Sequence, residues 1–292
     1  MGVVIKMLGD LHIHMILDGV YYRAAIDAQR EAPCDSLIRA RLADYRKRGV
    51  TFLRDGGDAW GVSLRAKALA PEYGIDYRSP AFPIYLRGHY GAFIGRGFTD
   101  LAGYRALLDE VSDAGGDFVK LMISGLIDFS RPNTLTEEGM SSELIFETVS
   151  LAHERGFAVM VHANGDRAVN AALAAGADSI EHGAYLHKET LARLSESKAL
   201  WVPTLSTIGN LIGSERYPDH VLCPLLTAQQ EKVAFVAAHG GRIGLGSDAG
   251  AFRVLHGQAA FDELSYLKQA LGETAEAALQ ASEDEVRTRF RR

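Results

Sequence analysis

Short apolar runs alternate along the chain with longer segments in which apolar residues recur every three or four positions. The short runs predict strands and the longer segments predict helices, because side chains repeat every two residues in a strand and every 3.6 in a helix. Eight strands are expected, at residues 7–15, 51–55, 76–82, 118–124, 158–164, 179–182, 200–205 and 242–248.

Helical patterns fill most of the intervals between the predicted strands. The clearest lie at 36–47, 101–112, 142–155, 167–175, 188–197 and 228–239, and further helices are expected from about residue 259. Strands that alternate with helices are typical of repeated βα units and a parallel sheet. Eight such units in 292 residues predict an α/β protein with a (β/α)8 TIM barrel, formed by residues 1–292 as a single domain.

Composition restricts the classes of partner. Hydrophobic residues make up 47% of the chain and charged residues 23%, which is typical of a globular protein, and we expect no membrane span. A formal net charge of -6 provides no broad basic surface for nucleic acid. Cys34 and Cys223 form no CxxC pair, and the first ten residues resemble no signal peptide, so we expect a cytoplasmic protein.

Two long connections interrupt the regular pattern, at residues 84–99 and 125–139. A βα connection usually needs only two to six residues, and longer ones are often functional. Both follow predicted strands, the third and the fourth, so they are expected at the carboxyl-terminal face, where barrel enzymes carry their active sites.

The first predicted strand contains two histidines, His12 and His14, in the sequence DLHIHM. Residues two apart in a strand point to the same side, so these imidazoles are expected side by side, with Leu11 and Ile13 on the opposite face. Two adjacent imidazoles suit a metal ion, although two ordinary strand histidines are the alternative interpretation.

Four more polar residues fall near the ends of other predicted strands: Lys120 on the fourth, His162 on the fifth, His182 on the sixth and Asp248 on the eighth. Each has a structural alternative, because a lysine can pair with a carboxylate, an aspartate can cap a helix, and a core histidine can be hydrogen-bonded. Together with the histidine pair they form the imidazole and carboxylate set expected for a divalent ion such as zinc or manganese.

The motifs DLHIH, DFVKLMISG, SLAHERGFAVMVHANG, AGADSIEHG, WVPTL and GLGSDAG occur in an order that resembles the amidohydrolase superfamily, particularly its imidazolonepropionase-like and metal-dependent prolidase-like branch. The resemblance covers nearly the whole chain. It implies a binuclear centre of two divalent ions, zinc in the first place and manganese, iron or cobalt as alternatives. In that centre one ion is held by His12, His14 and Asp248, the other by His162 and His182, and a carboxylated Lys120 bridges them.

Chemistry supports that modification of Lys120, because two cations repel an ammonium group whereas a carbamate supplies an anionic bridge. Metal-bound hydroxide would attack a carbonyl, and Asp248 would act as general base and then as general acid. We expect hydrolysis of a C–N amide bond in a peptide-like or cyclic amide small molecule. The alternatives are a lactonase, a carboxylesterase or a phosphotriesterase with the same centre, and a barrel that binds a metal or small ligand without catalysis.

Substrate contacts are expected from the loop LRGHYG, since the resembling branch often carries a glycine-histidine-glycine element there. His89 is the predicted oxyanion stabiliser. Arg87 could bind a substrate carboxylate, or it could be an ordinary surface arginine. The remaining candidates are Tyr90 in the same loop, Asn164 on the face of His162, and His256, for which a hydrogen-bonded loop histidine is the alternative.

The chain also departs from the family it resembles. Many relatives enclose the barrel between segments of a β-sandwich, but only residues 1–6 precede the first predicted strand and little follows Leu279. We therefore expect the sandwich to be absent, and the exposed helix faces leave a homo-oligomer open. Residues 126–129 stand where the branch often has a glycine-rich continuation, which weakens any analogy of substrate.

Overall fold

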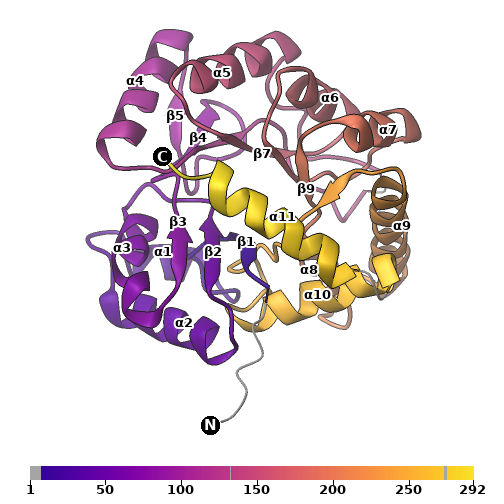
Figure 1. The fold of residues 1–292 in the computed structure, drawn as a ribbon, viewed down its shortest axis with the longest axis horizontal. Coiled ribbons are helices and arrows are strands. Elements are labelled where there is room, and N and C mark those ends of the chain that lie inside the picture. The colour runs from indigo at the N-terminus through magenta and orange to yellow at the C-terminus, as the bar shows by residue number, and fades with distance from the viewer. Residues whose placement is uncertain (1–7, 132, 273–274) are drawn as a thin grey trace.

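The structure is a computed structural model that describes residues 8–131, 133–272 and 275–292. It is an α/β fold in which parallel strands lie inside a ring of helices (Figure 1). The strands are β1 (Asp10–Ile13), β2 (Phe52–Asp55), β3 (Asp76–Arg78), β4 (Pro83–Leu86), β5 (Arg96–Phe98), β6 (Val119–Met122), β7 (Val159–Ala163), β8 (Ser179–His182), β9 (Leu200–Val202) and β10 (Arg242–Ile243).

The helices follow the strands in sequence. They are α1 (Tyr22–Asp27), α2 (Asp35–Lys47), α3 (Val62–Leu69), a short 3-10 helix (Ala70–Tyr73), α4 (Leu101–Asp113), α5 (Ser142–Glu154), α6 (Asp166–Ala174), α7 (Lys188–Glu196), α8 (Ser206–Gly209), α9 (Asp219–Ala238), α10 (Gln258–Leu271) and α11 (Ala275–Arg289). Within the described residues, no helix is both long and apolar enough to cross a membrane.

The strands form two parallel sheets, one with the order β1-β2-β3 and one with the order β10-β9-β8-β7-β6-β4-β5. Backbone hydrogen bonds connect β1 to the segment that follows β10, with 2.8 Å from Leu11 N to Leu245 O and 2.7 Å from Asp248 N to His12 O. The first and last strand regions therefore lie side by side. Each of the eight predicted strands contains an observed strand, although Met7, in the first of them, lies outside the described residues.

Some expectations about elements were wrong. The connection at 84–99 contains most of β4 and all of β5, which pair with each other at the edge of the larger sheet. Helices α1, α3 and α8 were not predicted, and α9 begins at Asp219 rather than at residue 228. These segments are short or include Gly or Pro, so their sequences carry little periodic signal.

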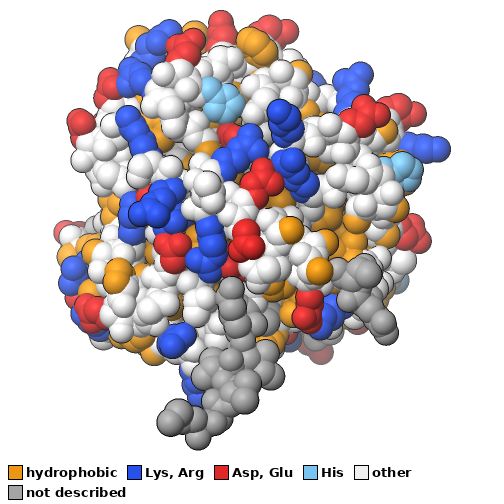
Figure 2. Space-filling view, in the orientation of Figure 1, with side chains coloured by type: hydrophobic (Ala, Val, Ile, Leu, Met, Phe, Trp, Pro, Cys, Tyr) orange, Lys and Arg blue, Asp and Glu red, His pale blue; other side chains and the backbone are white. Residues whose placement is uncertain are grey.

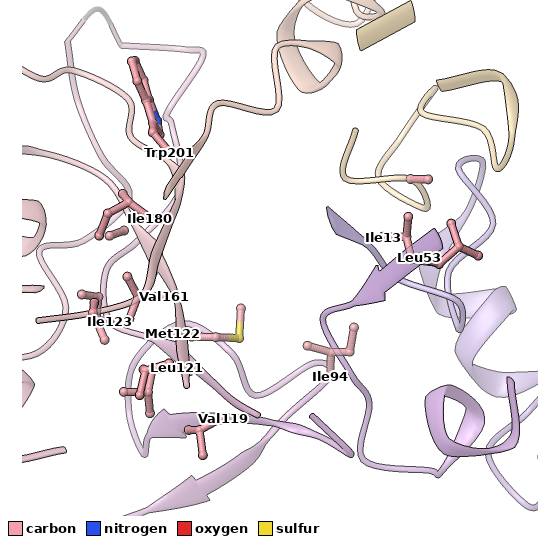
Figure 3. Packing of buried hydrophobic residues seen from close by; sticks show 14 of the residues in the cluster. Ile13, Leu53, Ile94, Val119, Leu121, Met122, Ile123, Val161, Ile180 and Trp201 are labelled. Atoms are coloured by element: carbon pink, nitrogen blue, oxygen red, sulfur yellow. The ribbon is translucent and has the colours of Figure 1, made fainter. Parts of the chain in front are cut away.

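The strands are buried by packing on both sides. Figure 3 shows Leu121, Val161 and Ile180, from β6, β7 and β8, on one side of their strands, whereas Met122 points to the other. All four belong to the main apolar core. This burial explains why the strands appear in the sequence as nearly continuous apolar runs.

A second, smaller apolar cluster lies beneath α11, the helix that crosses the front of the molecule in Figure 1. Val286 of α11 and Phe290, which follows that helix, pack there with Phe118, and the rings of Phe118 and Phe290 meet edge to face at 5.3 Å. Leu11 also belongs to this cluster. The expectation that Leu11 lies on the face opposite His12 and His14 was therefore wrong. The register of β1 shifts between Asp10 and Ile13, which breaks strict alternation.

Ion pairs cover the same end of the strands. Arg287 of α11 pairs with Asp76, at the start of β3, at 3.2 Å, and Arg242, at the start of β10, pairs with Glu285 at 2.9 Å. Figure 2 shows basic and acidic side chains intermingled on this face. The amino-terminal ends of the strands are thus closed by α11, which leaves the carboxyl-terminal ends for chemistry.

Candidate metal centre

Five of the six predicted metal ligands lie near or beyond the carboxyl-terminal ends of strands, whereas Lys120 is the second residue of β6. His12 is on β1 and His14 follows it, Lys120 is on β6, and His162 and His182 are on β7 and β8. Asp248 comes after β10, next to β1 through its backbone bond to His12. The parallel topology therefore gathers at one end of the sheets residues that are up to 236 positions apart in sequence.

His12, His14 and Asp248 form a compact triangle. The two Nε2 atoms lie 3.4 Å apart, and Asp248 Oδ1 lies 3.5 Å from His12 Nε2 and 3.4 Å from His14 Nε2. Ligands about 2.1 Å from a tetrahedral zinc ion are separated by about 3.4 Å. The three atoms fit one metal ion, and the Asp248 side chain is 15% exposed, so solvent can reach this corner.

Two candidate ligands have unusual backbone conformations. The φ angles of His182 and Asp248 are 68° and 61°, in the left-handed region that residues other than glycine seldom adopt. Each such residue costs on the order of 1 kcal/mol, and such strain is concentrated at functional sites. His182 is the last residue of β8, and Asp248 lies in the segment that follows β10.

The second group of candidate ligands surrounds Lys120. The rings of His162 and His182 lie 4.6 Å apart, and the ring of His182 lies 5.2 Å from that of His12. Lys120 Nζ is buried and has no hydrogen-bond partner among the described residues. A buried amine without a partner suits covalent modification or a nearby ligand better than a purely structural role.

The candidate ligand atoms of this second group are less well directed toward one point than those of His12, His14 and Asp248. His162 Nε2 lies 3.1 Å from the carbonyl oxygen of Gly125, and His182 Nδ1 lies 2.7 Å from Thr204 Oγ1. One nitrogen of each ring thus faces a neighbouring oxygen. The rings and Lys120 are close enough for a shared site, but these contacts must rearrange if His162 is to bind through Nε2.

Burial controls the protonation of these groups. It lowers the pKa of His14 and of His162 to about 3, with the nearby Lys120 charge as a further cause, so both imidazoles are neutral at neutral pH. Burial also lowers the pKa of Lys120 to about 8 and raises that of Asp248 to about 7. Neutral imidazole is the form that binds metal, and a neutral amine is the form that can react with carbon dioxide.

The predicted oxyanion loop lies beside this centre. The Tyr90 ring lies 5.0 Å from that of His162, while His89 Nδ1 is 3.3 Å from Glu137 Oε2 and the Tyr90 backbone N–H donates to Glu137 Oε1 at 2.6 Å. Glu137, which was not predicted as a site residue, therefore joins the two long loops. Arg87 is exposed, and its Nε donates to the Gly97 carbonyl at 3.0 Å.

Asn164 ties two loops together next to His162. Its Nδ2 donates to Gly125 O at 3.0 Å, and its Oδ1 accepts from Ala184 N at 2.9 Å. A role in substrate binding for this residue stays a prediction.

His256 uses both of its ring nitrogens within the protein. Its Nδ1 lies 3.1 Å from the Tyr45 hydroxyl oxygen, and its Nε2 lies 2.8 Å from the Leu17 carbonyl oxygen. These contacts are those of a hydrogen-bonded loop histidine, the alternative to a substrate-binding role. Substrate contact by His256 also stays a prediction.

Two charged residues next to the centre were missed at the sequence level. Arg54 on β2 and Glu181 on β8 are both fully buried, and they form an ion pair. The available signal was a charged residue inside each of two apolar strands, FLRD and SIEH. The same signal, a charged residue within an apolar strand, predicted Lys120.

Comparison with solved structures identifies proteins of similar fold. The chain superimposes on a Xaa-Pro dipeptidase crystallised with methionine in its active site, with a TM-score of 0.76, 21% identity, and coverage of 98% of this chain and 75% of that one. The ochratoxinase of A. niger matches with a TM-score of 0.73, 22% identity and coverage of 94% and 69%. A prolidase complexed with N-methylphosphonate-L-proline matches with a TM-score of 0.72 and 22% identity, over 97% of this chain and 74% of that one. The chain has the fold of prolidases and amidohydrolases.

Sequence comparison matches only about half of the chain. No protein-family model matches the chain. The uncharacterized protein Rv2915c of Mycobacterium tuberculosis (strain ATCC 25618 / H37Rv) is 32% identical over 148 residues, which is 49% of this chain and 39% of that protein. The uncharacterized protein Mb2939c of Mycobacterium bovis matches to the same extent. The chain thus matches well under half the length of these curated relatives.

Proposed function

We propose that this chain is a metal-dependent amidohydrolase of the prolidase-like branch, with a closed (β/α)8 barrel, and that it hydrolyses a C–N amide bond in a peptide-like or cyclic amide small molecule. The observation that carries the proposal is the triangle of His12, His14 and Asp248, with atom separations that suit one divalent ion. The buried amine of Lys120 beside the triangle supports a second metal position.

The names of the structural neighbours favour amide hydrolysis over the alternatives. They include a Xaa-Pro dipeptidase, a bottromycin amidohydrolase and a phenylurea hydrolase, and all three names indicate that a C–N bond is cleaved. The candidate ligands also gather at the carboxyl-terminal ends of parallel strands. Barrel hydrolases have their active sites at that end.

The residues fit two ions in the following way. One position would be held by His12, His14 and Asp248, the other by His162 and His182, and a carboxylated Lys120 would lie between them. Imidazole and carboxylate ligands favour zinc, with manganese, iron and cobalt as alternatives. When bound, such ions lower the pKa of water to about 7 and polarise the carbonyl under attack.

The chain itself supplies proton transfer and binding. Asp248, partly exposed at the edge of the centre, would accept a proton as the nucleophile attacks and return it to the departing nitrogen. His89, held beside Glu137, would donate to the oxygen that gains charge. Tyr90 and Phe93, whose rings lie 5.5 Å apart, would form an apolar wall for the substrate.

Carboxylation of Lys120 can be tested by mass spectrometry of the intact protein. Protein loaded with zinc in bicarbonate buffer should carry the mass of one added carbon dioxide under native conditions and lose it on acidification. The Lys120→Met variant should never show this mass. A crystal structure of zinc-loaded protein with an unmodified Lys120 that points away from the metals would contradict the bridging role.

A panel of substrates tests the reaction class. Zinc- or manganese-loaded protein should cleave some dipeptides, N-acyl amino acids or cyclic amides at least 100-fold faster, in kcat/KM, than lactones, carboxylic esters or phosphotriesters of similar size, a difference of about 2.7 kcal/mol in activation free energy. The opposite preference would favour the lactonase, carboxylesterase or phosphotriesterase alternative. Metal binding without turnover of any member of the panel would favour a non-catalytic barrel.

A further inference from the structure

The ion pair of Arg54 and Glu181 lies between the apolar cluster under α11 and the candidate metal centre. Both side chains are 0% exposed, and Arg54 Nη2 donates to Glu181 Oε1 at 2.9 Å. Taking two charges out of water costs several kcal/mol for each ion, and their attraction often does no more than offset that cost. A pair in this position therefore calls for a reason other than stability.

Arg54 is held in place on all sides. Its Nε donates to the Leu11 carbonyl at 2.6 Å, its Nη1 donates to Ser179 Oγ at 2.9 Å, and its guanidinium carbon lies 4.5 Å from the ring centre of Phe290. The guanidinium is a planar fork with fixed donor directions, so these contacts also fix the carboxylate that it binds.

The two oxygens of Glu181 have different surroundings. Oε1 accepts from Arg54 and also from Ser179 Oγ, at 2.5 Å. Oε2 has no hydrogen-bond partner among the described residues, and it lies 2.8 Å from His12 Nδ1, which likewise has none. A carboxylate used only to neutralise arginine would turn both oxygens toward the guanidinium. Here one oxygen is left facing a candidate metal ligand.

A proton on His12 Nδ1, together with a small turn of the ring that aligns the N–H with Oε2, would satisfy both buried atoms at once. The ring would then donate from Nδ1 to Glu181 Oε2, and the lone pair of Nε2 would point toward His14 Nε2 and Asp248 Oδ1. Metal-binding histidines commonly have their second nitrogen bonded in this way, which fixes the tautomer and the orientation of the ring.

We propose that Glu181, held by Arg54 and Ser179, is a positioning residue that fixes His12 in the Nδ1–H tautomer and directs its Nε2 to the first metal ion. This inference rests on the proposed function. Because Arg54 compensates the charge of Glu181, the pair orients His12 without adding net charge beneath the centre. Lys120 and Asp248 also face this layer, but no ion pair between either of them and Glu181 is present among the described residues.

The test compares Glu181→Gln with a matched control, Glu283→Gln. Glu283 is also buried beside an arginine, since Arg287 Nη2 lies 2.7 Å from its Oε1, but its other oxygen accepts from the Gly9 backbone N–H at 2.6 Å and contacts no histidine. Metal-depleted samples of both variants and of the natural protein are titrated with Zn²⁺ against a chromophoric chelator. Titration with Co²⁺ then reports ligand geometry through its visible absorption.

We expect Glu181→Gln to weaken the tighter Zn²⁺ site by about 10- to 100-fold and to change the Co²⁺ spectrum, whereas Glu283→Gln stays within about twofold of the natural protein. If Glu181→Gln does not fold, Ser179→Ala replaces it, because it removes the Ser179 bonds to Glu181 Oε1 and Arg54 Nη1 and leaves both charges in place. For that variant we expect a rise of about threefold in Kd, since Glu181 loses one of its two hydrogen bonds to Oε1 but keeps the bond from Arg54.

The outcomes separate the two proposals. Equal Zn²⁺ affinity and equal Co²⁺ spectra in Glu181→Gln and Glu283→Gln, or natural affinity in Ser179→Ala where that variant is used, would overturn the positioning role even if the protein hydrolyses amides. A natural protein that binds neither ion would instead overturn the metal centre itself.

Discussion

Replacing Asp248 with asparagine should lower kcat for amide hydrolysis by about 1,000-fold while the protein stays folded. The carboxylate is the one proposed ligand that can also move a proton, and it is partly exposed where substrate would bind. Asparagine keeps the shape of the side chain but cannot act as a base. Steady-state kinetics at saturating Zn²⁺, with metal content measured on the same samples, checks this result.

The matched control for this substitution is Asp262→Asn. Asp262 lies on α10, and its carboxylate accepts from Asn210 and Gln258, at 3.0 and 2.8 Å, and not from a candidate ligand. Its replacement should leave kcat within about twofold of the natural value, as is usual for a surface change. If the Asp248→Asn protein retained a tenth of the natural kcat with its metal bound, another group would have to be the base.

Removing metal is the second change with a large expected effect. Dialysis against a chelator should abolish hydrolysis and lower the melting temperature by about 8 °C, because ions bound at 1,000 times their Kd contribute about 4 kcal/mol and each kcal/mol shifts the midpoint by about 2 °C. Added Zn²⁺, Mn²⁺ or Co²⁺ should restore both properties. Activity assays and thermal unfolding of the same samples provide the measurement.

Metal analysis of histidine variants locates the effect. His14→Asn should bind about one ion fewer per chain than the natural protein, since it removes one corner of the triangle of ligand atoms. His153→Asn is the control, because His153 lies on α5 and its Nε2 is 2.9 Å from Asp178, at the opposite end of the strands. Full activity after exhaustive chelation would contradict the whole metal proposal.

The arrangement of the fold was largely readable from periodicity. Strands buried on both sides appear as apolar runs and amphipathic helices appear as repeats of three and four, so every predicted strand contains an observed strand and every predicted helix overlaps an observed helix. Periodicity did not predict the short strands and helices that are stabilised mainly by contacts with neighbouring elements. Strand β5 is three residues long and contains Gly97, and it exists because β4 offers an edge to pair with.

Local periodicity also failed inside β1. Strict alternation placed Leu11 away from the histidines, whereas the register shift places it in the cluster beneath α11. Helix α11 itself is a long-range partner of that strand, about 275 residues away in sequence. Packing against such a partner decided the orientation, and no window of sequence around Leu11 contains it.

The sequence by itself determined which groups were available and at which strand ends, because residue type and periodicity are local properties. It therefore provided the prediction that two histidines of one strand, a lysine, two later histidines and an aspartate would meet. The tertiary structure decided distances and partners: which three atoms form the triangle, that Lys120 Nζ has no partner among the described residues, and that Glu181 faces His12. Such contacts depend on how distant strands are placed beside each other, and burial then sets their strength by removing water.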